Sequence, residues 1–284
     1  MKRLLLISFG SLVNLVLVAA SANAAGISVD AGLTPAEDRW IFRTQVRYMQ
    51  RKNDPTAAGR RMKTYAYPFI LAYGVRPDLT LMVRQTLKDQ KSFMSGSSSR
   101  NTDLEDLFVL GKYKLYRRNT PDYTFGIAST LGVEFPTGSD PFTSETWDLQ
   151  PGVYTSWRSG PWATDFNIAY TWNGFADKGE GGLNPGDELS LDWALAYQFS
   201  FGEKSRVSLA PVLELSYKKI GSDRLSSDDV ENTGESVFYL SPGIKFTLSS
   251  FILEALVQIP VWQDQEGSQL ERDMTVIFGA RYMF

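Results

Sequence analysis

The sequence predicts an all-β fold, a 12-stranded antiparallel transmembrane β-barrel of the outer-membrane type, and three observations lead to it. Residues 274–284 alternate apolar and polar side chains and end on Phe284, with Tyr282 two residues earlier. Residues 1–24 have the form of a signal peptide. Between these ends, alternating runs recur, separated by turns that are alternately short and long. Alternation gives a strand one apolar and one polar face, as a barrel wall in lipid requires.

The N-terminus carries the secretory signal. Lys2 and Arg3 precede an apolar run over 4–20, and Ala22-Asn23-Ala24 supplies the small side chains of a cleavage site. This order of charged, apolar and small residues predicts cleavage after Ala24. The alternative, an uncleaved membrane anchor, needs a longer apolar run.

The predicted mature chain, 25–284, is a single barrel domain that begins with a short periplasmic segment over 25–37. It holds no stretch of about twenty apolar residues, so strands must do any spanning. The absence of cysteine excludes disulfides and thiolate chemistry. The nearly balanced charge, formally −3, gives no support to a nucleic-acid role.

The alternating runs define the strands, and the polar stretches between them define the loops. The predicted strands are 40–50, 62–74, 79–88, 104–116, 123–136, 148–158, 162–173, 187–201, 206–218, 237–248, 251–260 and 271–284. The predicted long loops are 52–61, 92–103, 137–147, 174–186, 220–234 and 263–269. An even strand number places both chain ends on the short-turn side, which is periplasmic in single-chain bacterial barrels.

Charge decides which face of each strand meets lipid. In the run 187–201, Leu189, Leu191 and Trp193 share one face, and Glu188 and Asp192 share the other. A lysine or arginine facing lipid at mid-bilayer costs roughly 2–4 kcal/mol, so the charged face lines the lumen.

Prolines interrupt several strands and remove ladder donors. They indicate either locally tuned curvature or a lateral opening toward lipid. These prolines are Pro68, Pro151, Pro211, Pro242 and Pro260.

The face assignment predicts a set of charged pore-lining residues. The first four strands form a basic wall, with Arg43, Arg47, Arg84, Lys88, Lys112 and Lys114. The next four form an acidic wall, with Glu134, Asp148, Asp165, Glu188 and Asp192. The last four are mixed, with Glu214, Lys245, Glu254, Asp273 and Arg281.

Opposed walls of this kind favour a narrow channel for passive uptake of small solutes, because a transverse field orients dipolar molecules. The same charges could instead pair across the lumen and fill it, giving a non-conducting structural or adhesive barrel. An outer-membrane enzyme is disfavoured because the chain has no histidine to act as a base. We predict no catalytic residue, no cofactor and no metal site.

Several short segments together point to one family. They are Gly32-Leu33-Thr34-Pro35, Arg39-Trp40-Ile41-Phe42-Arg43, Phe135-Pro136-Thr137-Gly138, Asn184-Pro185-Gly186-Asp187, Leu240-Ser241-Pro242-Gly243, Leu253-Glu254-Ala255 and Gln258-Ile259-Pro260-Val261. These segments resemble the outer-membrane β-barrel transporters of the meta-pathway of phenol degradation. The resemblance spans nearly the whole predicted mature chain and implies passage of aromatic compounds.

The predicted location is the outer membrane of a Gram-negative cell, with both termini in the periplasm. The predicted partners are outer-membrane lipids and lipopolysaccharide, the barrel-assembly machinery through the C-terminal Phe284, and a small-molecule solute. We predict no nucleic-acid partner.

Overall fold

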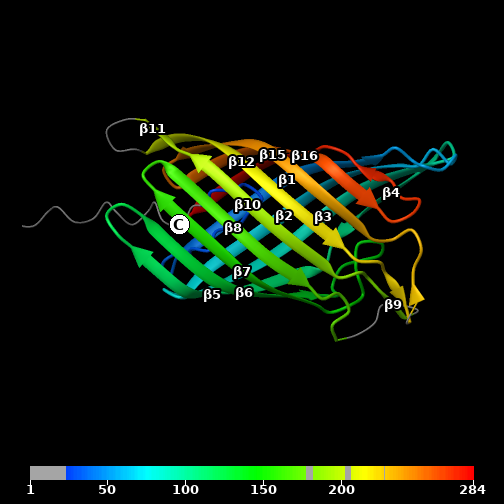
Figure 1. The fold of residues 1–284 in the computed structure, drawn as a ribbon, viewed down its shortest axis with the longest axis horizontal. Helices are drawn as coiled ribbons and strands as arrows, with labels where there is room; N and C mark the ends of the chain where they lie inside the picture. The colour runs from blue at the N-terminus through cyan, green and yellow to red at the C-terminus, as the bar shows by residue number, and fades with distance from the viewer. Residues whose placement is uncertain (1–23, 177–181, 202–205, 227) are drawn as a thin grey trace, which may run out of the picture.

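The computed structural model describes residues 24–176, 182–201, 206–226 and 228–284, and they form a closed antiparallel barrel (Figure 1). The predicted signal peptide up to residue 23, and residues 202–205 between the predicted strands 187–201 and 206–218, lie outside the described residues. No helix in the part of the chain that the structure describes is long and apolar enough to cross a membrane.

Among the described residues, the barrel wall consists of twelve strand positions, three of which are split by a short irregularity. In chain order they are β1 (Trp40–Lys52), β2 (Arg61–Arg76), β3 (Leu79–Met94), β4 (Ser97–Leu104) with β5 (Leu107–Asn119), β6 (Thr124–Phe135), β7 (Asp148–Ser159), β8 (Trp162–Thr171), β10 (Glu188–Tyr197) with β11 (Phe199–Phe201), β12 (Val207–Ile220), β15 (Glu235–Leu248), β16 (Phe251–Gln265), and β17 (Glu271–Arg272) with β18 (Thr275–Met283).

The last strand closes the barrel on the first. β18 pairs antiparallel with β1, from Ile41 opposite Met283 to Tyr48 opposite Val276. Beyond this ladder, the Trp40 N–H donates to the Phe284 carbonyl at 2.8 Å, and the Phe284 N–H donates back to Trp40 at 3.0 Å. The 12-stranded antiparallel barrel predicted from the sequence is thereby confirmed.

Alternation along each strand separates an apolar outside from a polar inside. On β8, the outward Phe166 and Ile168 are 44% and 41% exposed, whereas the inward Asp165 and Asn167 are 1% and 5% exposed. Exposed apolar side chains on every second residue of a closed sheet are the surface that lipid covers.

The loop predicted over 92–103 is wrong. β3 continues to Met94, turns at Ser95-Gly96 and returns as β4, so a two-stranded extension rises above the wall. Ser95 and Gly96 both have positive φ, 50° and 84°, the geometry of a tight hairpin turn. Residues 95–99 of this extension are serines and a glycine, so the sequence lacks the apolar alternation of a wall strand. An extension surrounded by water needs no apolar face.

At the long-loop end, three two-residue strands form a small separate sheet (Figure 1). β9 (Leu183–Asn184) comes from the loop after β8, and β13 (Arg224–Leu225) and β14 (Asp228–Asp229) come from the loop after β12. Backbone pairing between β9 and β13 therefore joins the two loops at this rim of the barrel.

The five strand prolines coincide with local gaps in the pairing. The β7–β8 ladder stops at Gly152, one residue after Pro151, and resumes as an isolated bridge between Leu149 and Trp172. Pro260 lies at a register shift between β15 and β16. The strands on either side of these points remain paired along the rest of their length, so the wall is closed in this structure.

The segment predicted to be a short periplasmic piece, 25–37, does not lie outside the barrel. Residues 24–34 run inside it, and Ala25, Ile27, Val29 and Leu33 are at most 3% exposed. We call residues 24–35 the N-terminal segment.

The face assignment gives a stability prediction. Phe166→Lys places a charge on the lipid face in the middle of β8 and should destabilise the barrel by about 2–4 kcal/mol. Leu248→Lys, at the end of β15 beside the Ser249-Ser250 turn, should cost about 0–1 kcal/mol, because its charge reaches the interface. Urea unfolding in lipid vesicles measures both values. Equal costs for the two variants would contradict the assignment.

Candidate functional site

The candidate site is the barrel interior at the short-turn end, where the N-terminal segment meets the wall. Every second residue of the segment is apolar, and this side packs against inward-facing apolar residues of the wall. The buried cluster consists of Ala25, Ile27, Val29, Ala194, Ala196, Val212, Leu256 and Ile277. A strip of the lumen is therefore apolar, and the segment covers it.

Two buried carboxylates hold the segment by its backbone N–H groups. Asp165 on β8 accepts from the Ala25 N–H at 2.5 Å. Glu214 on β12 accepts from the N–H groups of Ile27 and Ser28, and also from the Ser28 hydroxyl. Both side chains are almost fully buried.

Two lysines bind the carbonyl side of the same segment. Lys245 Nζ on β15 lies 2.6 Å from the carbonyl oxygens of Ala24 and Ala25. Lys112 Nζ on β5 lies 2.6 Å from the Ala31 carbonyl. The segment belongs to no sheet, so these side chains supply partners that a strand neighbour would otherwise give.

Gly32 brings the segment directly onto the backbone of β7. Its N–H donates to the Ser156 hydroxyl at 2.8 Å. A Cβ added at Gly32 would lie 2.4 Å from the Tyr154 carbonyl oxygen, well inside contact distance. Only glycine permits this approach.

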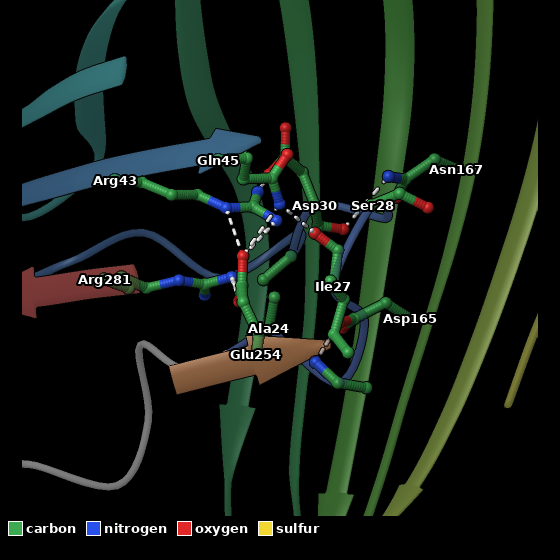
Figure 2. Close-up of polar contacts among 12 residues, drawn as sticks. Ala24, Ile27, Ser28, Asp30, Arg43, Gln45, Asp165, Asn167, Glu254 and Arg281 are labelled. Carbon is green, nitrogen blue, oxygen red and sulfur yellow. Dashed lines mark hydrogen bonds and ion pairs between the residues drawn. The ribbon is translucent and has the colours of Figure 1, made fainter. Parts of the chain in front are cut away.

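A buried charge cluster sits beside the segment at the seam where β18 meets β1. The Arg43 guanidinium contacts Glu254 at 2.8 Å, and Arg281 contacts the same carboxylate at 3.1 Å (Figure 2). Gln45 donates to Glu254 at 2.8 Å and to the Ile27 carbonyl at 3.4 Å. One carboxylate thus joins β1, β16 and β18 to each other and, through Gln45, to the segment.

Toward the long-loop end, charges pair between nearby strands. Glu188 and Lys218 lie 2.7 Å apart, and Arg84 and Glu134 lie 3.5 Å apart. Lys88 pairs with Glu105. Glu235 forms ion pairs with Arg51, at 3.0 Å, and with Arg272. Because each pair joins a cation to a carboxylate, the pairs reduce the electric field expected between the predicted basic wall and the predicted acidic wall.

The sixteen charged residues predicted from the sequence fall into three groups. Those in the segment site are Arg43, Lys112, Asp165, Glu214, Lys245, Glu254 and Arg281. Those farther along the interior are Arg47, Arg84, Lys88, Glu134, Glu188 and Asp192. Those at the barrel ends or in a loop network are Lys114, Asp148 and Asp273.

The last group lies apart from the other predicted residues. Lys114 donates to the Pro77 carbonyl in the β2–β3 turn at 2.8 Å. Asp273 pairs with Lys52 at 2.7 Å. Asp148 accepts from the Gly174 N–H at 2.8 Å and from Thr146, and so it organises a loop.

Sequence reasoning missed the neutral and cationic neighbours that complete the site. Arg158 and Ser156 both bind Asp165, at 2.7 and 2.5 Å. Asn167 donates to the Asp30 carbonyl at 3.0 Å. The segment itself had a readable signal, the apolar alternation over 25–33, which matches the period of a strand.

Outside the membrane-spanning strands, one carboxylate organises the loop between β1 and β2. Asp54 accepts from the Arg60 N–H at 2.6 Å and from the Thr56 N–H at 3.0 Å, and the Arg60 guanidinium lies 2.8 Å away. The Arg60 side chain holds the pKa of Asp54 well below its usual range. The carboxylate therefore stays ionised at neutral pH.

Fold and interior together define an outer-membrane β-barrel whose lumen holds a segment of its own chain. A family model described as "Putative MetA-pathway of phenol degradation" matches residues 64–265, and the chain belongs to that family. The family predicted from the sequence is thereby confirmed. No curated protein matches the sequence.

Two solved structures share the barrel fold at low sequence identity. The COG4313 outer membrane channel from Pseudomonas putida F1 is 13% identical, with a TM-score of 0.67, over 89% of this chain and 97% of that one. The beta domain of the Bordetella autotransporter Brka is 10% identical, with a TM-score of 0.51, over 87% of this chain and 100% of that one. The similarity concerns the fold.

The carboxylate contacts predict that Glu214→Ala releases the N-terminal segment. Two backbone donors would lose their buried acceptor, at a cost of about 1–3 kcal/mol each. Because the chain has no cysteine, a single Val29→Cys reports the release by maleimide labelling. We expect labelling at least about tenfold faster in the Glu214→Ala background, since about 1.4 kcal/mol is a factor of ten. The control is Glu188→Ala, whose Lys218 pair lies away from the segment; equal rates in all three proteins would contradict the contact.

A second variant tests the close approach at Gly32 by the same labelling. Gly32→Val places methyl groups against the Tyr154 backbone and should displace the segment, so the Val29→Cys thiol becomes reactive. Gly111→Ala on β5 is the matched control, because its added Cβ has no neighbour closer than 3.9 Å. A thiol that stays protected in the Gly32→Val protein would contradict the close approach of Gly32 to the Tyr154 backbone.

Proposed function

We propose that this protein is an outer-membrane channel for passive uptake of small solutes, and that the N-terminal segment narrows its path. Membership of the family and the closed barrel support the channel class. The signal peptide, contact with lipopolysaccharide, periplasmic termini and assembly through the C-terminal Phe284 are parts of the same proposal.

One observation carries the proposal: side-chain contacts, and no strand pairing, hold the segment in the lumen. Asp165, Glu214, Lys112 and Lys245 contact its backbone without making it part of the wall. Such contacts can break and re-form while the barrel stays closed. A path beside or behind the segment is therefore compatible with an intact wall.

Two observations bear on the class of solute. The family description supports aromatic compounds, and the charged residues of the interior support solutes with a polar or charged group. We retain the prediction of a basic side on β1, β3 and β5 and an acidic side on β6 to β10. The pairs Arg84–Glu134 and Glu188–Lys218 reduce the field expected from it.

The second candidate is a non-conducting structural or adhesive barrel. The buried N-terminal segment favours it, because the lumen at the short-turn end is filled by chain. The long loops would then be the working surface. An enzymatic role has no support from the residues, because the chain has no histidine and the buried carboxylates bind backbone or cations.

Single-channel recording in planar bilayers separates the two candidates. We expect a small, steady conductance from the mature protein and a severalfold larger one from a variant that lacks residues 25–35, because the deletion removes the obstacle. Gel mobility before and after heating checks that each barrel is folded. The full-length Gly32→Val variant should also conduct more than the parent.

Liposome swelling with small aromatic and polar solutes then ranks what passes. Absence of conductance from folded samples of the parent, the deletion and the Gly32→Val variant would establish the non-conducting barrel instead.

A further inference from the structure

Cationic side chains gather on the outer surface of the wall at the long-loop end. The strand register places Lys63 of β2 opposite Lys91 of β3, and Lys91 opposite Arg100 of β4. Residues directly opposite each other on adjacent strands share one face of the sheet. This face is the outer one, because Tyr65, on the same side of β2 as Lys63, is 42% exposed. Three cations therefore lie side by side on three adjacent strands.

Arg61 adds a fourth cation on the same face, farther from the middle of the wall. It lies opposite Phe93, and its guanidinium carbon is 4.3 Å from the centre of the Phe93 ring. Lys91 Nζ lies 5.0 Å from the same ring centre. Phe93 thus holds two of the cations at the surface by cation–π contact. We call Arg61, Lys63, Lys91 and Arg100 the basic patch.

The basic patch has one carboxylate beside it. Asp89 of β3 faces the same way and accepts hydrogen bonds from the Arg100 guanidinium at 2.7 and 2.5 Å. The other three cations of the patch form no ion pair within the part of the chain that the structure describes. Asp103 of β4 faces the inner side of the sheet, and Asp273, beyond β1, pairs with Lys52. Four cations therefore stand against one carboxylate.

This arrangement is unfavourable for the sheet by itself. Like charges directly opposite each other on adjacent strands repel, because the Cβ atoms at such positions lie only about 4.5–5.5 Å apart. An anion that binds between neighbouring cations removes the repulsion. A ligand with several anionic groups can do so along the whole row from Lys63 to Arg100.

The basic patch lies at the level of the lipid headgroups. At the short-turn end of β2, Tyr73 stacks on Trp40 with ring centres 4.3 Å apart, and toward the long loops Tyr65 packs on Tyr48 at 5.1 Å. Such aromatic pairs mark the two edges of the apolar band. From Tyr73 to Lys63, a rise of about 3.4 Å per residue and a strand tilt of about 35–45° give a height of about 24–28 Å. The apolar band of these barrels is about 25 Å tall, so Lys63 lies at its edge.

We propose that the basic patch binds the phosphate groups of lipopolysaccharide in the outer leaflet. Charge-assisted hydrogen bonds from Lys63, Lys91 and Arg100 hold the phosphate oxygens. A lipid with more than one phosphate matches a row of cations better than a phospholipid, which has a single phosphate. Leu87 and Leu104, opposite each other on the same face toward the middle of the wall, contact its acyl chains.

The proposal rests on the proposed function in one respect, the orientation that puts the long loops outside the cell. It assigns to one surface the lipopolysaccharide contact that is proposed there for the barrel as a whole.

Binding of lipid A, the phosphorylated lipid part of lipopolysaccharide, tests the patch by native mass spectrometry of the folded mature protein in detergent. Diphosphorylated lipid A should bind saturably, and the same lipid without its phosphates at least tenfold more weakly. Lys63→Met and Lys91→Met should each weaken binding severalfold, and the double variant at least tenfold. Asp89→Asn removes the one carboxylate and should strengthen binding, whereas a merely structural role of the patch predicts a loss.

Lys219→Met is the matched control. Lys219 is exposed on the outer face of β12 at the same end of the barrel, and its neighbours on the adjacent strands, Leu189 and Ser236, carry no charge. This variant should bind lipid A within twofold of the parent.

Absence of lipid A binding to the parent overturns the proposal. Equal affinity for the dephosphorylated lipid, or equal losses in the Lys91→Met and Lys219→Met variants, overturns it as well. Phosphatidylglycerol that competes as strongly as lipid A would overturn the assignment to lipopolysaccharide.

Conductance tests the channel separately, because the basic patch faces away from the lumen. The Lys63→Met, Lys91→Met double variant should conduct like the parent. Conductance without lipid A binding would refute the patch and leave the channel standing; lipid A binding without conductance would do the reverse.

Discussion

The structure depends on one constraint: polar groups inside a closed barrel must find partners there, because lipid surrounds the wall. The lumen side chains and the N-terminal segment satisfy this constraint for each other. Asp165 and Glu214 need donors, and the segment has unpaired N–H groups. Lys112 and Lys245 need acceptors, and the segment has free carbonyls. Without the other, each set would leave buried polar groups without hydrogen-bond partners, which costs free energy.

The same principle joins barrel closure to the interior. The ladder between β18 and β1 closes the wall, and the cluster of Arg43, Glu254 and Arg281 lies directly inside that seam. Breaking a buried ion pair by removing one partner typically costs about 3–5 kcal/mol, because the remaining charge is uncompensated. Gln45 extends the cluster to the Ile27 carbonyl. Seam, cluster and segment should therefore respond together to any change at Glu254.

The barrel could be predicted from sequence because lipid imposes a period of two on each strand. Phe166 and Asp165 show that period directly, one outside and one buried. The position of the N-terminal segment inside the lumen was not predicted, although its apolar residues also alternate with a period of two. The alternation was used only to assign the faces of the wall strands. Ile277 carries the clearest sign of the segment: this apolar side chain points into the lumen and is fully buried in the cluster that contains Ile27. The hairpin at Ser95-Gly96 escaped because it stands in water, where no apolar face is required.

Hydrogen exchange of the backbone amides, followed by mass spectrometry on the folded protein in lipid, tests the central claim most directly. The amides of Ile27 and Ser28 are hydrogen-bonded to the buried Glu214 carboxylate and should exchange as slowly as those of the barrel strands. Complete exchange of residues 25–33 within seconds, beside protected strands, would show that the segment lies outside the lumen and would contradict this account.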